Sequence, residues 1–264
     1  MNIAISTGTF YKVPFINTLD MIKRSGFDYI ELLQYWKGGD SWEMAQHLES
    51  ITPKETLNII KESGLKISSL HDGGGVIETG KESVIAKSTY EFLEYGIDDI
   101  PCIVFHMPHR NTDDKNWKET YKSIAGRDLS SIREVIVCIE NMPSFEGFEA
   151  ISSDPFELLD FASMYGLYIN IDTTHYAQMG IDIIEAAKIL KERVRTVHLS
   201  DYLSPKSHIY LGEGTLSLNS FIKNLDTSLL HAVTIECDVE YNESNIDKTI
   251  ERLSNVLSIV KRMV

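Results

Sequence analysis

Eight short runs of apolar and β-branched residues recur along the chain, and each is followed by a segment with helical periodicity. The runs are almost continuously apolar, which is typical of parallel strands buried on both faces. They start mostly 26 to 38 residues apart, the length of one strand and one helix. The predicted strands span residues 2–6, 29–33, 66–71, 102–106, 135–140, 168–172, 195–200 and 232–236.

The segments between these runs carry signals that begin and end helices. Thr52-Pro53 and Asp154-Pro155 combine a capping side chain with a proline suited to the first helical turn. Three segments end at a glycine that can cap a helix, namely Gly26, Gly64 and Gly166. In the region 111–133 we expect Gly126 to separate two helical pieces.

The repetition of eight such units predicts one α/β domain over residues 1–264. No linker or shift in composition divides the chain, and 264 residues suit a single (β/α)8 barrel, the TIM barrel. A doubly wound open sheet is the competing architecture.

Composition narrows the choice of partners. The chain has 25 basic and 39 acidic residues, a net charge of −14 that repels phosphate backbones, so we expect a small-molecule substrate and no nucleic acid. Three cysteines without a paired motif indicate a reducing compartment. We expect a cytoplasmic protein, since neither a signal peptide nor a membrane-spanning apolar stretch is apparent, and a homodimer is the default assembly.

Side chains that can bind metals stand at the ends of most predicted strands. In a barrel these ends meet at one mouth, where several carboxylates would repel one another unless a cation lay between them. Mixed carboxylate and imidazole ligands suit zinc, manganese, cobalt or iron. The residues concerned are Glu31, His71, His106, Glu140, Asp172, His198 and Glu236, with His175 and His208 on following loops.

Six motifs in this order resemble the xylose isomerase-like TIM barrels, which include sugar isomerases, sugar epimerases and family 2 AP endonucleases. They are FHMPH (105–109), CIENMP (138–143), NIDTTH (170–175), VHLSD (197–201), HIYLGEGTLSL (208–218) and TIECD (234–238).

The resemblance implies one divalent metal, zinc or manganese first and cobalt or iron as alternatives, held by Glu140, Asp172, His198 and Glu236. His71 and His106 match ligands of a second metal in the multi-zinc endonucleases. His175 and His208 match ligands of a third metal there.

One departure from the endonuclease pattern affects that third site. Lys206 stands where those enzymes have an aspartate, two residues before the histidine that corresponds to His208. Its charge opposes a cation, so we do not expect a complete third site. His175 and His208 are then expected to contact substrate oxygens. Lys206 either holds a carboxylate or phosphate of the substrate or is a solvated loop charge.

Two enzyme functions use these residues differently. In an isomerase or epimerase of a sugar, ketose or cyclitol-like substrate, Glu140 and Glu236 would pass a proton across the substrate, and His175 would stabilise the enediolate oxygen. In an endonuclease IV-like AP endonuclease, two or three metals would hydrolyse a phosphodiester. The acidic charge and Lys206 favour the isomerase or epimerase. A catalytically silent barrel that binds a sugar or a partner is a third hypothesis.

Overall fold

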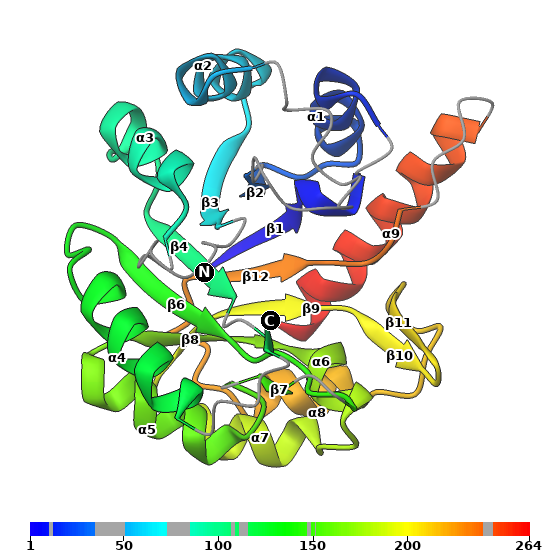
Figure 1. The fold of residues 1–264 in the computed structure, drawn as a ribbon. Helices are drawn as coiled ribbons and strands as arrows, with labels where there is room; N and C mark the ends of the chain where they lie inside the picture. The colour runs from blue at the N-terminus through cyan, green and yellow to red at the C-terminus, as the bar shows by residue number, and fades with distance from the viewer. Residues whose placement is uncertain are drawn as a thin grey trace.

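In the computed structural model, eight parallel strands close into a barrel surrounded by helices (Figure 1). Around the barrel the strands follow the order β1-β12-β9-β8-β6-β4-β3-β2. The predicted (β/α)8 barrel is therefore confirmed, and the open sheet is excluded. The structure describes residues 1–10, 13–34, 51–72, 85–106, 109–110, 116–146, 149–150, 152–239 and 245–264.

Each of the eight predicted strands forms one barrel strand, with ends that differ by one residue in three cases. Two small antiparallel sheets lie outside the barrel: β5 with β7, and the hairpin of β10 and β11, which projects beyond the end of β9 (Figure 1). The barrel strands are β1 (Asn2–Ser6), β2 (Tyr29–Leu33), β3 (Lys66–His71), β4 (Cys102–His106), β6 (Ile136–Glu140), β8 (Tyr168–Asp172), β9 (Val194–Leu199) and β12 (Ala232–Ile235). The strands outside the barrel are β5 (His109–Arg110), β7 (Glu149–Ala150), β10 (Asp201–Leu203) and β11 (Lys206–Ile209).

Helices cover the outside of the barrel. None of those in the described part of the chain is both long and apolar enough to cross a membrane. They are the 3-10 helix η1 (Thr7–Phe10) and α1 (Phe15–Arg24), α2 (Pro53–Ser63), α3 (Lys87–Gly96), α4 (Trp117–Leu129), α5 (Pro155–Tyr165), α6 (Thr173–Gln178), α7 (Ile183–Leu190), α8 (Leu218–Lys223) and α9 (Ile246–Met263).

The predicted helix signals act as expected at α2 and α5. Thr52 and Glu55 form a reciprocal capping box at the start of α2, and the Asp154 side chain accepts two backbone N–H groups at the start of α5. Gly64 and Gly166 follow these helices with φ angles of 71° and 70°, the left-handed conformation that glycine adopts without strain.

The prediction that Gly126 divides a helix is wrong, because α4 runs through it without interruption. Gly126 instead allows α4 to pack closely against α5. A Cβ atom at this position would lie 2.2 Å from the Tyr165 ring of α5, so the absence of a side chain lets the two helices approach. Tertiary packing therefore overrides the weak helix propensity of glycine at this position.

The strands alternate between two environments. Residues such as Ile139 and Ile171 are fully buried in the apolar layer between strands and helices. Their neighbours Glu140 and Asp172 are also fully buried, and the two-residue period of a strand turns them to the barrel interior. The apolar layer therefore holds the barrel together, while the interior face remains free to carry polar chemistry.

Candidate metal centre

The strand register brings the polar strand ends to one level of the barrel. Asp172 of β8 lies beside His198 of β9, and His106 of β4 lies beside Glu140 of β6. Glu236 follows β12 directly, two residues beyond Thr234, which pairs with His198. Residues separated by more than a hundred positions in the sequence thus face one small volume at the carboxyl ends of the strands.

We call Glu140, Asp172, His198 and Glu236 the central group. One ligand atom from each residue lies within 4.8 Å of the others. Nδ1 of His198 stands between two carboxylates, 3.1 Å from Oε2 of Glu140 and 2.8 Å from Oε2 of Glu236. The structure therefore gathers the four residues that the sequence resemblance names as a shared metal site.

The central group fits a divalent cation by its unused donor atoms. Both carboxylate oxygens of Glu140, Oδ2 of Asp172 and Nδ1 of His198 are buried and make no hydrogen bond within the described part of the chain. Their close polar neighbours include one another, with Nδ1 of His198 3.1 Å from Oε2 of Glu140, so a cation placed among them would satisfy several of these atoms at once. Three carboxylates and one imidazole are a suitable donor set for zinc, manganese, cobalt or iron.

The two carboxylate oxygens of Asp172 have different roles, one in capping a helix and one in the central group. Its Oδ1 accepts the backbone N–H groups of Thr174 and His175 at 2.7 and 2.8 Å, and so caps helix α6. Its Oδ2 remains for the central group. The cap fixes the carboxylate in place, because rotation would break both hydrogen bonds.

Three further groups adjoin the central one. One of them, Glu31, His71, His198 and Glu236, shares two residues with it, and the other two share one residue each. In the first of these two, His71, His106 and Glu140, the Nε2 atoms of the two histidines are 2.8 Å apart. In the second, Asp172, His175 and His208, the ligand atoms also lie within 4.8 Å of one another. His208 has a φ of 50° and directs its Nδ1 to the Glu236 carbonyl oxygen at 3.0 Å. All the histidines expected at the mouth are thus gathered there.

Charges in the metal-free centre alternate in sign. Burial opposes a charge on His198, but the carboxylates of Glu140, Glu236 and Glu31 outweigh it and raise its pKa well above the usual value. For Glu140, burial is likewise outweighed by the adjacent histidines, so its pKa lies well below the usual value. Burial also opposes a charge on His175, yet Asp172 and Glu140 raise its pKa to about 9. Protons on these histidines therefore stabilise the carboxylates when no metal is bound.

Asn141 is a part of the site that the sequence analysis did not name. Its side chain accepts the N–H of Asp172 at 2.7 Å and donates to the carbonyl of the same residue at 3.0 Å. Its own carbonyl oxygen lies 2.8 Å from Nδ1 of His175. A buried amide directly after Glu140 in a strand-end motif is the signal that could have indicated this role.

Lys206 stands two residues before His208 in the chain. It begins β11 of the outer hairpin and is exposed to solvent. Its expected contact with substrate remains a prediction.

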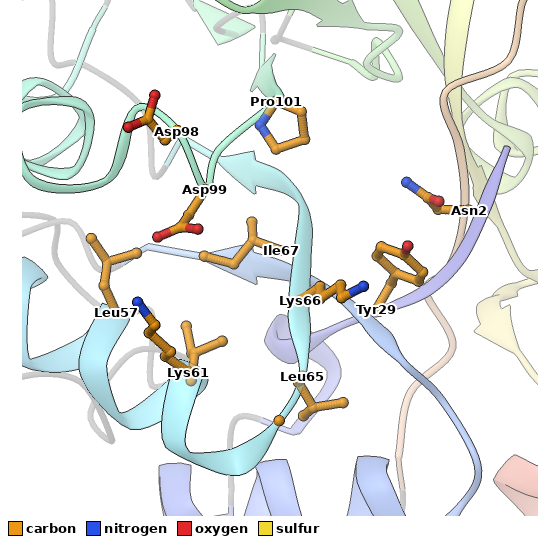
Figure 2. Close-up of a pocket in the computed structure, with 12 residues that line it drawn as sticks. Asn2, Tyr29, Leu57, Lys61, Leu65, Lys66, Ile67, Asp98, Asp99 and Pro101 are labelled. Carbon is orange, nitrogen blue, oxygen red and sulfur yellow. The ribbon is translucent and has the colours of Figure 1, made fainter.

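A pocket of about 470 Å³ opens at the opposite end of the barrel (Figure 2). It is lined by the first residues of three strands, Asn2, Tyr29 and Lys66, and by side chains of α2 such as Leu57 and Lys61. None of the described metal-binding groups touches it. Active sites of this fold lie at the carboxyl ends of the strands, so we place the candidate site at the central group.

Solved structures with a similar fold include several enzymes. A xylose isomerase domain protein from Alicyclobacillus acidocaldarius has a TM-score of 0.74 and 12% identity, over 100% of this chain and 99% of that one. A D-psicose 3-epimerase studied in the presence of D-fructose has a TM-score of 0.70 and 16% identity, over 100% and 99% of the two chains. The IOLI protein with a bound zinc atom has a TM-score of 0.70 and 15% identity, over 99% and 96%.

At these identities the likeness establishes the fold alone. No curated protein sequence matches the chain. A family model described as the xylose isomerase-like TIM barrel matches residues 19–256. This match extends over most of the chain and includes every strand-end residue discussed above. The chain therefore belongs to the xylose isomerase-like TIM barrel family.

Proposed function

We propose that the protein is a divalent-metal-dependent isomerase or epimerase of a small sugar, ketose or cyclitol-like substrate, with or without a phosphate group. The observation that carries this proposal is the pair of glutamates on either side of His198, within a buried centre whose ligand atoms are orphaned. The family supports it, as do the D-psicose 3-epimerase and the zinc-containing IOLI protein among similar structures.

Glu140 and Glu236 are the proton-transferring groups in this proposal. They stand on β6 and just after β12, which are separated around the barrel by β8 and β9, so they approach a bound substrate from different sides. One carboxylate removes a proton from carbon, and the other returns it at the opposite face or at the neighbouring carbon. A divalent cation held by the central group would polarise the substrate carbonyl and acidify the adjacent C–H.

His175 and His208 supply hydrogen bonds to substrate oxygens. The Nδ1 atoms of both rings are directed to backbone carbonyl oxygens, those of Asn141 and Glu236. Nε2 of His175 is then the ring atom available to a ligand, while Nε2 of His208 lies 3.3 Å from the hydroxyl of Thr174. In the metal-free site, burial opposes a charge on His175 but Asp172 and Glu140 raise its pKa to about 9, and a protonated ring can donate from Nε2 to a developing enediolate oxygen. Lys206 is the proposed contact for an anionic group farther along the substrate.

Exchange of hydrogen with solvent tests the proton transfer. Metal-loaded protein is incubated in D₂O with a panel of ketoses, inososes and hydroxy acids, and deuterium at carbon is followed by NMR. We expect exchange with at least one member, reduced about 100- to 10,000-fold in both Glu140→Gln and Glu236→Gln. Glu185→Gln, an exposed glutamate on α7, is the matched control. Exchange that persists in both variants would contradict the proposal.

A multi-metal phosphodiesterase of the AP endonuclease type is the second candidate. The clustering of the groups favours it. Glu140 and Asp172 each belong to two groups, an arrangement that suits more than one cation. The net charge of −14 and the position of Lys206 favour the isomerase or epimerase instead. Incision of DNA containing an abasic site, at low salt and with zinc or manganese, would make this candidate the first choice.

A further inference from the structure

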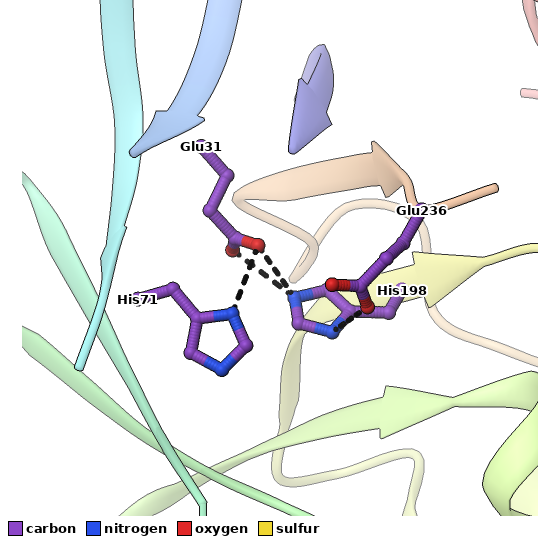
Figure 3. Close-up of side chains that lie close together, drawn as sticks. All are labelled: Glu31, His71, His198 and Glu236. Atoms are coloured by element: carbon purple, nitrogen blue, oxygen red, sulfur yellow. Dashed lines mark hydrogen bonds and ion pairs between the residues drawn. The ribbon is translucent and has the colours of Figure 1, made fainter. Parts of the chain in front are cut away.

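Glu31 is a fully buried carboxylate that the proposed proton transfer does not use. It lies in β2, three strands around the barrel from His198 of β9, and reaches that ring across the barrel interior. Nε2 of His198 is 2.9 Å from Oε1 and 3.1 Å from Oε2 of Glu31 (Figure 3). The hydroxyl of Ser69 donates to Oε2 at 2.7 Å and holds the carboxylate in this orientation.

The two nitrogens of His198 face different partners. Nε2 faces Glu31, and Nδ1 faces Glu140 and Glu236 of the central group. A histidine that binds a metal through one nitrogen usually donates the N–H of the other to a carboxylate or carbonyl, which fixes the tautomer and the ring orientation. The carboxylate of Glu31 can only accept here, so it selects the tautomer with hydrogen on Nε2 and a lone pair on Nδ1.

His71 also contacts Glu31, but through Nδ1 where His198 uses Nε2. Its Nδ1 lies 3.5 Å from Oε1 of Glu31, a longer contact than that of His198 (Figure 3). Its Nε2 faces His106 at 2.8 Å and Glu140 at 3.7 Å. The same carboxylate thus lies behind one histidine of the central group and one histidine of the adjoining group.

We infer that Glu31 is a positioning residue for the metal centre: it accepts the N–H of His198 Nε2, and more weakly that of His71 Nδ1, and so presents the opposite nitrogens as ligands. The inference rests on the metal dependence of the proposed function, but not on the identity of the substrate. It assigns a purpose to an ionisable group whose burial would otherwise only destabilise the fold.

Direct metal binding by Glu31 is the alternative, because its carboxylate also lies within 4.8 Å of ligand atoms of His71, His198 and Glu236. A cation there would use Nε2 of His198, the nitrogen turned away from Glu140. It would leave Oδ2 of Asp172 buried without a hydrogen bond, and the oxygens of Glu140 with only neighbouring histidines beside them. A cation in the central group satisfies those atoms and leaves the bond from His198 to Glu31 intact, so the geometry favours positioning.

The test compares wild-type protein with Glu31→Gln, using zinc and cobalt alone as probes. We expect zinc affinity, measured by chelator competition, to fall about 10- to 100-fold. The visible spectrum of the cobalt-loaded variant should keep the band intensity of the wild type, because no ligand is lost. In zinc-loaded protein with ¹⁵N-labelled histidine, the shift of one hydrogen-bearing Nε2 should move, while the metal-bound Nδ1 of the same ring remains metal-bound.

Asp72→Asn is the matched control, since the buried carboxylate of Asp72, at the same strand end, accepts hydrogen bonds from the N–H of Ala86 and the hydroxyl of Thr89. It should leave zinc affinity unchanged. Ser69→Ala should weaken zinc binding in the same direction as Glu31→Gln and by less. If Glu31→Gln does not fold, Glu31→Asp carries the same test, because it retains the charge but withdraws the carboxylate by one methylene.

Three outcomes would overturn the positioning role of Glu31, and they can be told apart. Unchanged zinc affinity in a folded Glu31 variant would overturn the positioning role and leave the metal centre standing. A cobalt spectrum that shows a lost ligand would make Glu31 a ligand and also overturn it. A wild-type protein that binds neither zinc nor cobalt would overturn the proposed metal dependence itself, together with this inference.

Discussion

The two ends of the barrel place charge in opposite environments. At the carboxyl end, Glu140 and His198 are fully buried and face one another, with 3.1 Å between Oε2 of Glu140 and Nδ1 of His198. At the amino end, Lys61 and Lys66 line the pocket of about 470 Å³, but both side chains are exposed to water. The cluster of buried ionisable residues and this pocket therefore lie at different ends of the barrel. Buried charge is costly to maintain, so this cluster of buried ionisable side chains is a better indicator of a functional site than the open pocket is.

Removal of metal should have the largest effect on the carboxyl end. Dialysis against a chelator should abolish solvent exchange into substrate, and readdition of zinc or manganese should restore it. Circular dichroism should show that the metal-free protein remains folded, since protons on the histidines stabilise the carboxylates. Full activity after complete metal removal, checked by elemental analysis, would contradict the account.

Removal of the His198 imidazole should have the second-largest effect. His198→Ala leaves Glu31, Glu140 and Glu236 close together without a cation between them. We expect the free energy of unfolding of the metal-free protein at pH 7 to fall by about 3–5 kcal/mol, as when one partner of a buried ion pair is deleted. Urea unfolding measures this. A loss within the range of an exposed substitution would show that the buried charges are not coupled as described.

The pH dependence of the metal-free protein sharpens the comparison further. The pKa of His175 is raised from 6.5 to about 9, so its stabilising contribution is complete below pH 6.5 and is lost as pH rises toward 9. Glu140 is shifted below 4.5, so its contribution is complete above that value and is lost in acid. Chemical unfolding should therefore show greatest stability at about pH 5–6. Zinc affinity should increase with pH, because the cation must displace a proton from His198.

A flat zinc affinity between pH 6 and 8 would contradict this protonation scheme. Apparent stability that rises toward pH 9 in the metal-free protein would do the same.

A substitution at the amino end of the barrel should have the smallest effect. Lys66→Ala removes an exposed side chain that lines the pocket there. We expect a change in the free energy of unfolding within about 0.5 kcal/mol, with zinc affinity and solvent exchange unchanged. The same measurements used for His198→Ala supply the check. A loss of activity or of metal binding would show that the pocket belongs to the functional site.

Much of the fold could be predicted from the chain because local patterns encode it. The apolar runs, the cap at Thr52 and the left-handed Gly64 each depend on neighbouring residues, and all are present in the structure. Gly126 is different, because its role depends on Tyr165 of another helix, and the local signal for a break was misleading.

The residues of the candidate site could be predicted from the sequence, but the orientations and contacts of their side chains could not. Parallel strands bring their ends together whatever the side-chain conformations, so the gathering of Asp172, His198 and Glu236 follows from the order of the strands. Which nitrogen of His198 faces the centre depends on its rotamer and on Glu31, which is 167 positions away in the chain. Sequence spacing contains no information on such a contact across the barrel interior.

The metal content of the purified protein is the most direct test of the claim that the carboxyl end is a metal centre. Protein expressed with zinc, manganese, cobalt and iron supplements is freed of loosely bound ions, and metal per chain is determined by elemental analysis. The account predicts one tightly held divalent metal per chain, lost in Glu140→Gln. Two or three metals per chain would favour the phosphodiesterase, and no bound metal after supplementation would contradict the account.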